Sequence, residues 1–347
     1  MPSAKTEATE LSVAFGLLGY TDPTARPFTE VEEKFEGTLI PEKHQAYIEE
    51  YTRPRNQPLY SRMLNVGANL RLRYPLFSNL TSLRWSGPER QAATIATARD
   101  LQAVNVPISV KAESRVVGNP SPYNIFISTP QGSAQARGTR SWYLESALGQ
   151  YQAYYGYIRE ITDNLSLPED VGVFEQSRNK APLRTALRAM VLNPQQKETE
   201  ERLYLEMCHT AASGAARIFN ENLATSLDSR TRGSVLERIA KMFFRMNAVG
   251  YVLCGIDGRS DFAVLVPDLT SWLREWEFGE IQSSPDLTRG QSVVDFSVIC
   301  RHKTRGDEYN AQFHAEVRWS HGRFSSVEGK LYKEFDWVDL PFFETIF

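Results

Sequence analysis

The stretch DLQAVNVPISVKAES (residues 100–114) predicts the two neighbouring strands on which the fold and the candidate site depend. Asp100 ends one strand-like segment, and Ser109–Val117 forms the next after a short connection. Side chains alternate between the two faces of a strand, so Lys111 and Glu113 are predicted to share a face with the first residue of the second strand. A hairpin would then bring the Asp100 carboxylate beside the Lys111 ammonium, with Glu113 one step along the same face.

This combination of side chains is typical of metal-assisted phosphodiester cleavage. Carboxylates hold Mg²⁺ (or Mn²⁺), which polarises the phosphate and lowers the pKa of an attacking water. A nearby lysine orients or deprotonates that water, or stabilises the developing charge. We therefore expect Asp100 and Glu113 to be metal ligands and Lys111 to be catalytic. Because Lys111 lies in an otherwise apolar strand, partial burial is expected to lower its pKa.

At these residues the sequence resembles the PD-(D/E)XK superfamily of restriction-endonuclease-like nucleases. The match is Asp100, a gap, and then Ser109-Val110-Lys111 on the adjacent strand. The sequence departs from the family pattern at Ser109, where the acidic residue of the (D/E)xK unit is expected. The resemblance implies that another carboxylate completes the metal site, and Glu113 and Glu145 are the nearest candidates.

A second resemblance lies in the helix predicted after these strands. Gln150 and Tyr154 fit the QxxxY element of the RecB-like branch of the same superfamily. They are four residues apart and so are expected on one face of the helix, where they would support the core or bind substrate. The alternative is that both belong to an amphipathic packing face, since the surrounding segment is rich in tyrosine.

Polar and basic residues outside this segment are candidates for contact with phosphate. They come from a proline-restricted loop, a glycine-rich basic segment and a C-terminal run that combines cations with an aromatic residue. The candidates are Asn119, Arg137, Arg140, Arg318, His321 and Arg323. A plain turn at the loop and an ordinary hairpin at the C-terminal run are the alternatives.

The alternation of strand-like and helical segments predicts an α/β protein whose mixed β-sheet core is flanked by helices, with a helical insert and a strand-rich C-terminal part. We expect residues 123–130 to form a strand and the segment from residue 140 to about 164 to form one helix. Four successive segments are predicted: a helical lead-in at 1–58, the nuclease-like α/β core at 59–165, a helical region at 166–250 and a strand-rich region at 251–347.

Composition limits the class of protein. The chain has 347 residues and a formal net charge of −3, with an ordinary share of hydrophobic residues, which excludes disordered and collagen-like classes. Its three cysteines are widely spaced, which argues against a disulfide scaffold or a zinc site. No apolar run approaches the length of a membrane span, so we expect a cytoplasmic, reduced protein with no membrane partner. The excess of acids in residues 1–50 is interpreted as a solvated helical surface.

Taken together, these observations favour a Mg²⁺-dependent endonuclease that hydrolyses DNA phosphodiester bonds. The resemblance implies a role in restriction or anti-phage defence. Cleavage of both strands would favour a homodimer, and the other expectation is a partner protein in a defence complex. The main alternative is a non-catalytic nucleic-acid- or protein-binding subunit with a degenerate nuclease core, which Ser109 keeps open. A third is a nucleotide hydrolase that uses the loop at 131–140.

Overall fold

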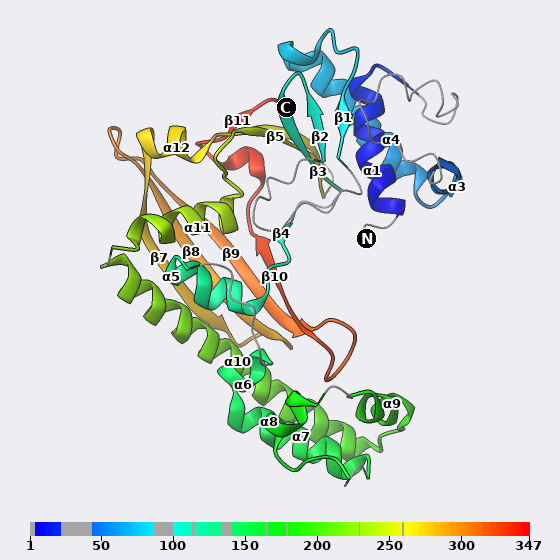
Figure 1. Cartoon of the computed structure of the whole chain (residues 1–347), viewed down its shortest axis with the longest axis vertical. Coiled ribbons are helices and arrows are strands. Elements are labelled where there is room, and N and C mark those ends of the chain that lie inside the picture. The colour runs from blue at the N-terminus through cyan, green and yellow to red at the C-terminus, as the bar shows by residue number, and fades with distance from the viewer. Residues whose placement is uncertain are drawn as a thin grey trace. The chain divides into compact units, whose positions relative to one another are not determined.

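The protein divides into two compact units, each built from separate parts of the chain (Figure 1). The computed structural model describes residues 4–21, 44–86, 100–112, 115–133, 141–163, 166–177, 180–228, 230–258 and 260–347. The first unit is Met1–Arg115, Arg245–Trp276 and Phe335–Phe347, and the second is Val116–Phe244 and Glu277–Glu334. The fold is mixed α/β with two sheets and flanking helices, as predicted. Each unit consists of segments that are separated in the sequence by segments of the other unit. The predicted division into four successive segments therefore differs from the observed one.

The first unit contains a six-stranded mixed sheet. Its strands, in spatial order, are β1 (Arg84–Trp85), β2 (Leu101–Ala103), β3 (Val106–Lys111), β5 (Tyr251–Asp257), β6 (Ser260–Val266) and β11 (Glu344–Thr345). β3 and β5 are parallel, and every other neighbouring pair is antiparallel. A parallel pair needs a long crossover connection. Here that connection includes the whole Val116–Phe244 segment of the second unit.

A tight turn at Val104 and Asn105 sets the register of β2 and β3. Both residues have positive φ angles, 48° and 66°, as in the two-residue hairpin turns that match strand twist. The turn places Leu101 opposite Ile108. Two boundaries therefore differ from the prediction: the expected connection after Asp100 contains a strand, β2, and β3 ends at Lys111. The strand expected to end at Asp100 lies outside the described residues. The expected continuation to residue 117 is a separate strand, β4 (Val116–Gly118), in the other sheet.

Two glycines allow helices α1 (Ala4–Leu17) and α4 (Gln57–Arg73) of the first unit to pack at very close range. A Cβ atom added at Gly67 would lie 2.1 Å from the Val13 carbonyl oxygen, and one at Gly16 would lie 2.0 Å from the Leu64 carbonyl oxygen. α1 is buried on nearly all sides, which is typical of a helix inside a core. The other helices described in this unit are α3 (His44–Thr52), α12 (Leu269–Glu275) and the short 3₁₀ turns η2 (Pro75–Phe77) and η4 (Trp337–Asp339).

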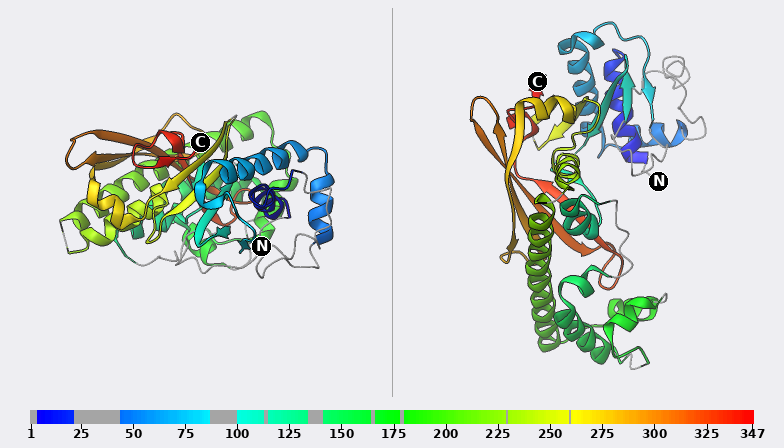
Figure 2. Two further views of the ribbon diagram at one scale, coloured as in Figure 1. Left: turned by 90° about the horizontal axis from the view of Figure 1, so that it is seen from above. Right: turned by 60° about the vertical axis from the view of Figure 1, so that its left-hand side comes forward.

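The second unit contains a five-stranded sheet with a long helix along it (Figure 2). The strand order is β4, β10 (Val327–Lys333), β9 (Glu308–Trp319), β8 (Ser292–His302) and β7 (Trp276–Asp286). The helix is α10 (Pro194–Leu227), which begins at an Asn193 capping box. Helices α8 (Val171–Gln176), α9 (Ala181–Ala189) and α11 (Arg232–Phe244) complete the helical region predicted near residues 168–250.

Two local predictions in the second unit are wrong. The strand expected at 123–130 is a π-helical turn, η3 (Asn124–Ser128), followed by the short helix α5 (Thr129–Gln131). Ile125 and Phe126 are fully buried there, so packing overrides their strand preference. The helix expected from residue 140 is broken at Ala147 into α6 (Trp142–Ser146) and α7 (Leu148–Ile161).

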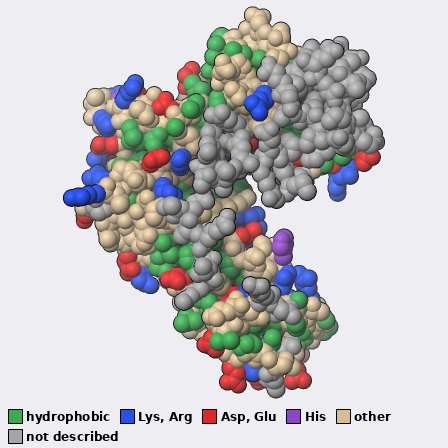
Figure 3. All heavy atoms as spheres, in the orientation of Figure 1, with side chains coloured by type: hydrophobic (Ala, Val, Ile, Leu, Met, Phe, Trp, Pro, Cys, Tyr) green, Lys and Arg blue, Asp and Glu red, His purple; other side chains and the backbone are tan. Residues whose placement is uncertain are grey.

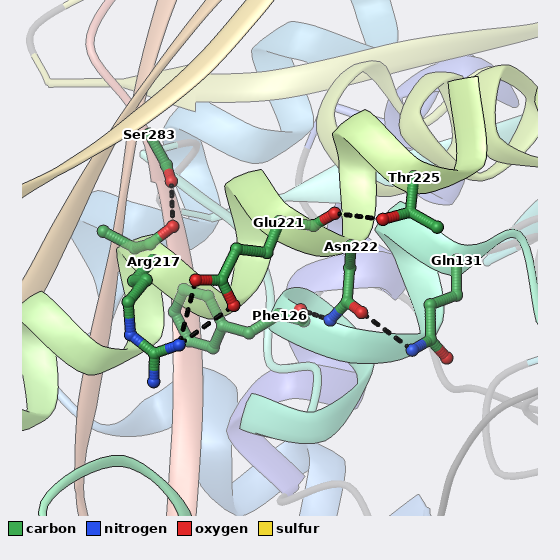
Figure 4. A network of polar contacts seen from close by, with 8 residues as sticks. Phe126, Gln131, Arg217, Glu221, Asn222, Thr225 and Ser283 are labelled. Atoms are coloured by element: carbon green, nitrogen blue, oxygen red, sulfur yellow. Dashed lines mark hydrogen bonds and ion pairs between the residues drawn. The ribbon is translucent and has the colours of Figure 1, made fainter. Parts of the chain in front are cut away.

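The Asn222 side chain joins α10 to η3 and α5 (Figure 4). Asn222 donates to the Phe126 carbonyl oxygen at 3.3 Å and accepts from the Gln131 side chain at 2.9 Å. Its donor and acceptor groups are thus both used, which satisfies polar groups of η3 and α5 at the same time. The three cysteines are buried free thiols. Among the described helices, none combines the length and apolar character needed to span a membrane.

The glycine contact between α1 and α4 leads to a stability prediction. Replacing glycine by alanine inside a helix ordinarily stabilises it by up to about 1 kcal/mol. Gly67→Ala should instead destabilise the protein by about 1–3 kcal/mol, because its methyl group would meet the backbone of α1. The matched control is Gly156→Ala in α7, where nothing lies within 4 Å of the added Cβ. Denaturant unfolding of both variants should give free-energy changes of opposite sign, and a stabilised Gly67→Ala protein would contradict the close packing.

Candidate active site

The Asp100 carboxylate lies at the start of β2 and turns toward β3. Its Oδ2 atom accepts a 2.6 Å hydrogen bond from the backbone N–H of Val110 and a 3.2 Å bond from the Ser109 hydroxyl. The Asp100 backbone is fixed on both sides, since its N–H donates to Ile108 and its carbonyl accepts from Ser86. Among the described residues no donor reaches Oδ1, so one carboxylate oxygen is available to a cation.

Lys111 lies at the end of β3, on the strand next to Asp100, as predicted from the sequence. Its neighbour across the parallel pair is Gly255 of β5. A Cβ atom at position 255 would lie 1.9 Å from the Lys111 carbonyl oxygen, so only glycine allows this approach of the two strands. The backbone position of Lys111 therefore depends on a strand that follows it by more than a hundred residues in the sequence.

The Lys111 ammonium has an acid–base character unlike that of a surface lysine. The positive charge of Arg245 and then burial lower the pKa of Lys111 to about 8. The negative charges of Asp100 and Glu10 act in the opposite direction. Near neutral pH such a lysine both donates and accepts protons readily, which is a property expected of a general acid or base.

Arg245 is held in this cluster by an unusual backbone conformation. Its φ angle of 58° lies in the left-handed region, which non-glycine residues seldom adopt. The Arg245 carbonyl oxygen accepts hydrogen bonds from the Asn247 side chain at 2.8 Å and from the Tyr251 hydroxyl at 3.1 Å. Its guanidinium lies 3.5 Å from the Ser109 hydroxyl. Strained backbone held by several bonds is a common feature of functional sites.

Glu10 of α1 supplies a second carboxylate. Burial, followed by the negative charge of Asp100, raises the pKa of Glu10 to about 8. The indole N–H of Trp85, a fully buried residue of β1, donates to Glu10 Oε2 at 2.9 Å and so orients the carboxyl group. Glu10 and Asp100 are thus close enough to repel one another when both are charged.

The solvated surface expected for the acidic residues near the N-terminus is wrong for several of them. Glu7 and Glu50 are buried at 2% and 3% exposure, and both accept hydrogen bonds from tyrosine hydroxyls. Glu10 is partly buried and was not among the predicted site residues. The sequence did carry a signal for it, because it is a single acid directly before the apolar run LSVAFGLL. Arg245 carries no comparable signal.

Glu10, Asp100, Lys111 and Arg245 together form what we call the acid–base cluster, two acids and two bases within the first unit. No group of three or more acidic, histidine or cysteine side chains suited to hold a metal occurs in the part of the chain that the structure describes. The oxygen donors that the cluster offers to a cation are therefore the two carboxylates. Repulsion between them is what a divalent cation would relieve.

The other predicted catalytic residues lie elsewhere. Glu113 is outside the described residues, as are Arg137 and Arg140. Glu145 is exposed on α6 in the second unit, so it belongs to a different unit from Asp100. Among the predicted substrate-binding residues, Asn119 and Gln150 are exposed in the second unit.

The remaining predicted substrate-binding residues gather at one end of the second unit. Tyr154 is fully buried and donates to Glu200 at 2.6 Å, which places it in the packed aromatic core. Arg323 also contacts Glu200, and its guanidinium lies over the ring of the buried Tyr204. Arg318 forms ion pairs with two glutamates of β9 and β10, and His321 is exposed in the turn between these strands.

Comparison with known proteins gives no relative. No protein-family model matches the chain, and neither a curated protein nor a solved structure matches it. The chemistry of the chain must therefore be inferred from the acid–base cluster itself.

The raised pKa of Glu10 predicts how stability depends on pH. Between the ordinary value of 4.5 and about 8, the folded state keeps a proton that the unfolded state loses, so the free energy of unfolding falls as pH rises through this window. Glu10→Gln keeps an acceptor for Trp85 but cannot ionise. Relative to the wild type, it should gain at least about 1.4 kcal/mol between pH 5 and pH 8, the equivalent of one pKa unit.

Urea unfolding in chelated buffer at the two pH values measures this difference. Glu344→Gln is the matched control, because Glu344 is exposed on β11 of the same unit, and it should leave the pH dependence unchanged. Parallel pH dependence in the wild type and Glu10→Gln would show that the Glu10 carboxyl titrates as an ordinary surface acid.

Proposed function

We propose that the protein is a Mg²⁺-dependent nuclease that hydrolyses DNA phosphodiester bonds at the acid–base cluster. The observation that carries this proposal is the meeting of two mutually repelling carboxylates with a lysine whose pKa is lowered to about 8. Perturbed carboxylates and lysines of this kind concentrate at catalytic sites. The resemblance to PD-(D/E)XK nucleases supports the same proposal, because Asp100 directly precedes β2 and Lys111 ends β3, the strand paired with β2.

The donor set of the cluster fits a hard divalent cation. Mg²⁺ is usually bound through one or two carboxylates, with waters and substrate phosphate oxygens as its other ligands. Glu10 and Asp100 would hold it, and Glu113 stays a predicted further ligand. When bound, the cation would polarise a phosphate oxygen and lower the pKa of a bound water. Burial and then the negative charge of Asp100 raise the pKa of Glu10, and a bound cation would offset the repulsion between the two carboxylates.

Lys111 and Arg245 supply the positive groups that the reaction needs. With its pKa near 8, Lys111 can take a proton from the attacking water in its neutral form or orient the water as an ammonium. The water oxygen forms a bond to phosphorus while the bond to the leaving sugar oxygen breaks. Negative charge grows on the phosphate during this step, and the always-charged Arg245 guanidinium stabilises it.

Substrate and biological role are proposed from the resemblance. DNA as substrate, restriction or anti-phage defence as role, and a homodimer or a defence complex as assembly all rest on it. A two-fold dimer would present one cluster to each strand of a duplex.

One observation favours the alternative of a non-catalytic binding subunit. Ser109, at the position where the family pattern expects a carboxylate, is fully buried and hydrogen-bonded to Asp100. Arg245 lies beside it, so that position holds a neutral hydroxyl next to a cation. In this interpretation the Asp100 carboxylate is already held by the Ser109 hydroxyl and the Val110 N–H, and no cation is needed. Nucleic-acid binding would then occur without cleavage.

Cleavage of supercoiled plasmid distinguishes the two functions. The wild type should nick or linearise the plasmid with Mg²⁺ and lose this activity in EDTA. Lys111→Ala should slow cleavage by about 10²-fold or more, the usual contribution of a general acid or base. Lys5→Ala is the matched control, since Lys5 is the exposed lysine described on α1, and it should cleave at the wild-type rate. DNA retention without cleavage in the wild type would favour the binding subunit and contradict the nuclease.

A further inference from the structure

Two arginines of the second unit converge on one main-chain oxygen. Arg184 and Arg188 are one turn apart on α9, and both guanidinium groups donate to the carbonyl oxygen of His321, at 3.4 and 3.1 Å. His321 lies in the turn between β9 and β10, so α9 and this turn hold the two cations in place. Figure 3 shows a histidine next to a group of Lys and Arg side chains at this end of the unit.

The charges of this pair are not neutralised by the described residues. Like charges four residues apart on a helix cost about 0.2–0.5 kcal/mol. Elsewhere in the unit the same spacing is used for attraction: Arg202 pairs with Glu206, and Arg217 pairs with Glu221 (Figure 4). For Arg184 and Arg188 no carboxylate partner occurs among the residues that the structure describes. Arg188 is exposed and Arg184 half-buried, so the pair presents positive charge to which an external anion can bind.

A cavity adjoins the same turn and supplies an independent observation. It has a volume of about 300 Å³ and is lined by Ser320 and Gly322, the two neighbours of His321, and by Arg318 and Arg323. The Arg323 guanidinium lies 3.2 Å from the centre of the Tyr204 ring, which also lines the cavity. The same guanidinium pairs with the Glu200 carboxylate at 3.4 Å, so part of its charge is already offset within the unit.

Trp319 of β9 is a further residue of the cavity lining. Trp319 lines it, is 6% exposed, and its buried Nε1 atom has no hydrogen-bond acceptor among the described groups. A buried donor without a partner costs about 1–3 kcal/mol. Arginines and an aromatic surface thus gather around one turn. Arg318 and Arg323 are paired with glutamates there, whereas Arg184 and Arg188 have no carboxylate partner among the described residues.

From this arrangement we infer that α9 and the β9–β10 turn form a surface that binds the phosphate backbone of a nucleic acid. Guanidinium groups pair with phosphate oxygens through two parallel N–H bonds, and aromatic–arginine surfaces accept bases or sugars beside them. This inference goes beyond the nuclease proposal because it requires no chemistry at the acid–base cluster. The surface contributes retention on nucleic acid, through Arg184 and Arg188 at its edge.

Binding of the full chain to a labelled DNA duplex in EDTA tests the inference without cleavage. Each phosphate contact contributes roughly 0.9 to the slope of log affinity against log salt concentration. Arg184→Ala/Arg188→Ala should therefore lower that slope by about 2 and the affinity by tenfold or more at low salt. The matched control removes the same charge from the same unit: Arg202→Ala/Arg217→Ala should change the slope by much less.

Further variants separate loss of charge from loss of fold. Arg184→Lys/Arg188→Lys keeps both charges and should keep the wild-type salt slope, even though it weakens the bonds to His321. The inference is overturned if the alanine pair binds with the wild-type slope, if the control pair weakens binding equally, or if polyglutamate or inorganic phosphate binds and DNA does not. A wild type that binds DNA through these arginines but never cleaves it would refute only the nuclease proposal.

Discussion

The repulsion between two partly buried carboxylates is the constraint on which the acid–base cluster depends. Glu10 lies on helix α1 and Asp100 directly precedes strand β2, far apart in the sequence. The protein keeps them near one another although burial and then the Asp100 charge raise the pKa of Glu10. A structure selected only for stability would separate such groups or replace one of them. The chain instead places Lys111 and Arg245 beside them, so the site contains both positively and negatively charged groups.

Several backbone features exist to place these four side chains. The contact of Gly16 and Gly67 with the facing helices brings α1 and α4 together, and α1 carries Glu10. Gly255 lets β5 approach Lys111, and the left-handed residue Arg245 turns its guanidinium toward Ser109. Each feature costs conformational freedom or strain, and each serves the geometry of the same cluster. Local strain at one site, supported by rigid elements around it, is the pattern expected of a catalytic or binding centre.

Sequence reasoning reached the local part of this arrangement. It identified Asp100 and Lys111 as neighbours because a hairpin connects them, and it predicted most helices and strands from their periodicity. It missed Glu10 and Arg245 because their contacts depend on the tertiary fold: one was assigned to a solvated acidic surface, and the other follows a helix of the second unit. The prediction of a strand around Ile125 was also wrong for a tertiary reason, because burial against α10 decides the conformation of this segment.

Direct measurement of divalent-cation binding tests the central claim that Glu10 and Asp100 form a metal site. Mn²⁺ can be titrated into the full chain and the free ion counted by electron paramagnetic resonance. A metal site at these residues should show saturable binding, with Asp100→Asn and Glu10→Gln each weakening it by about tenfold or more, as expected when one of two carboxylate ligands is lost. Binding that is equally strong in the wild type and both variants, or no saturable binding at all, would contradict it.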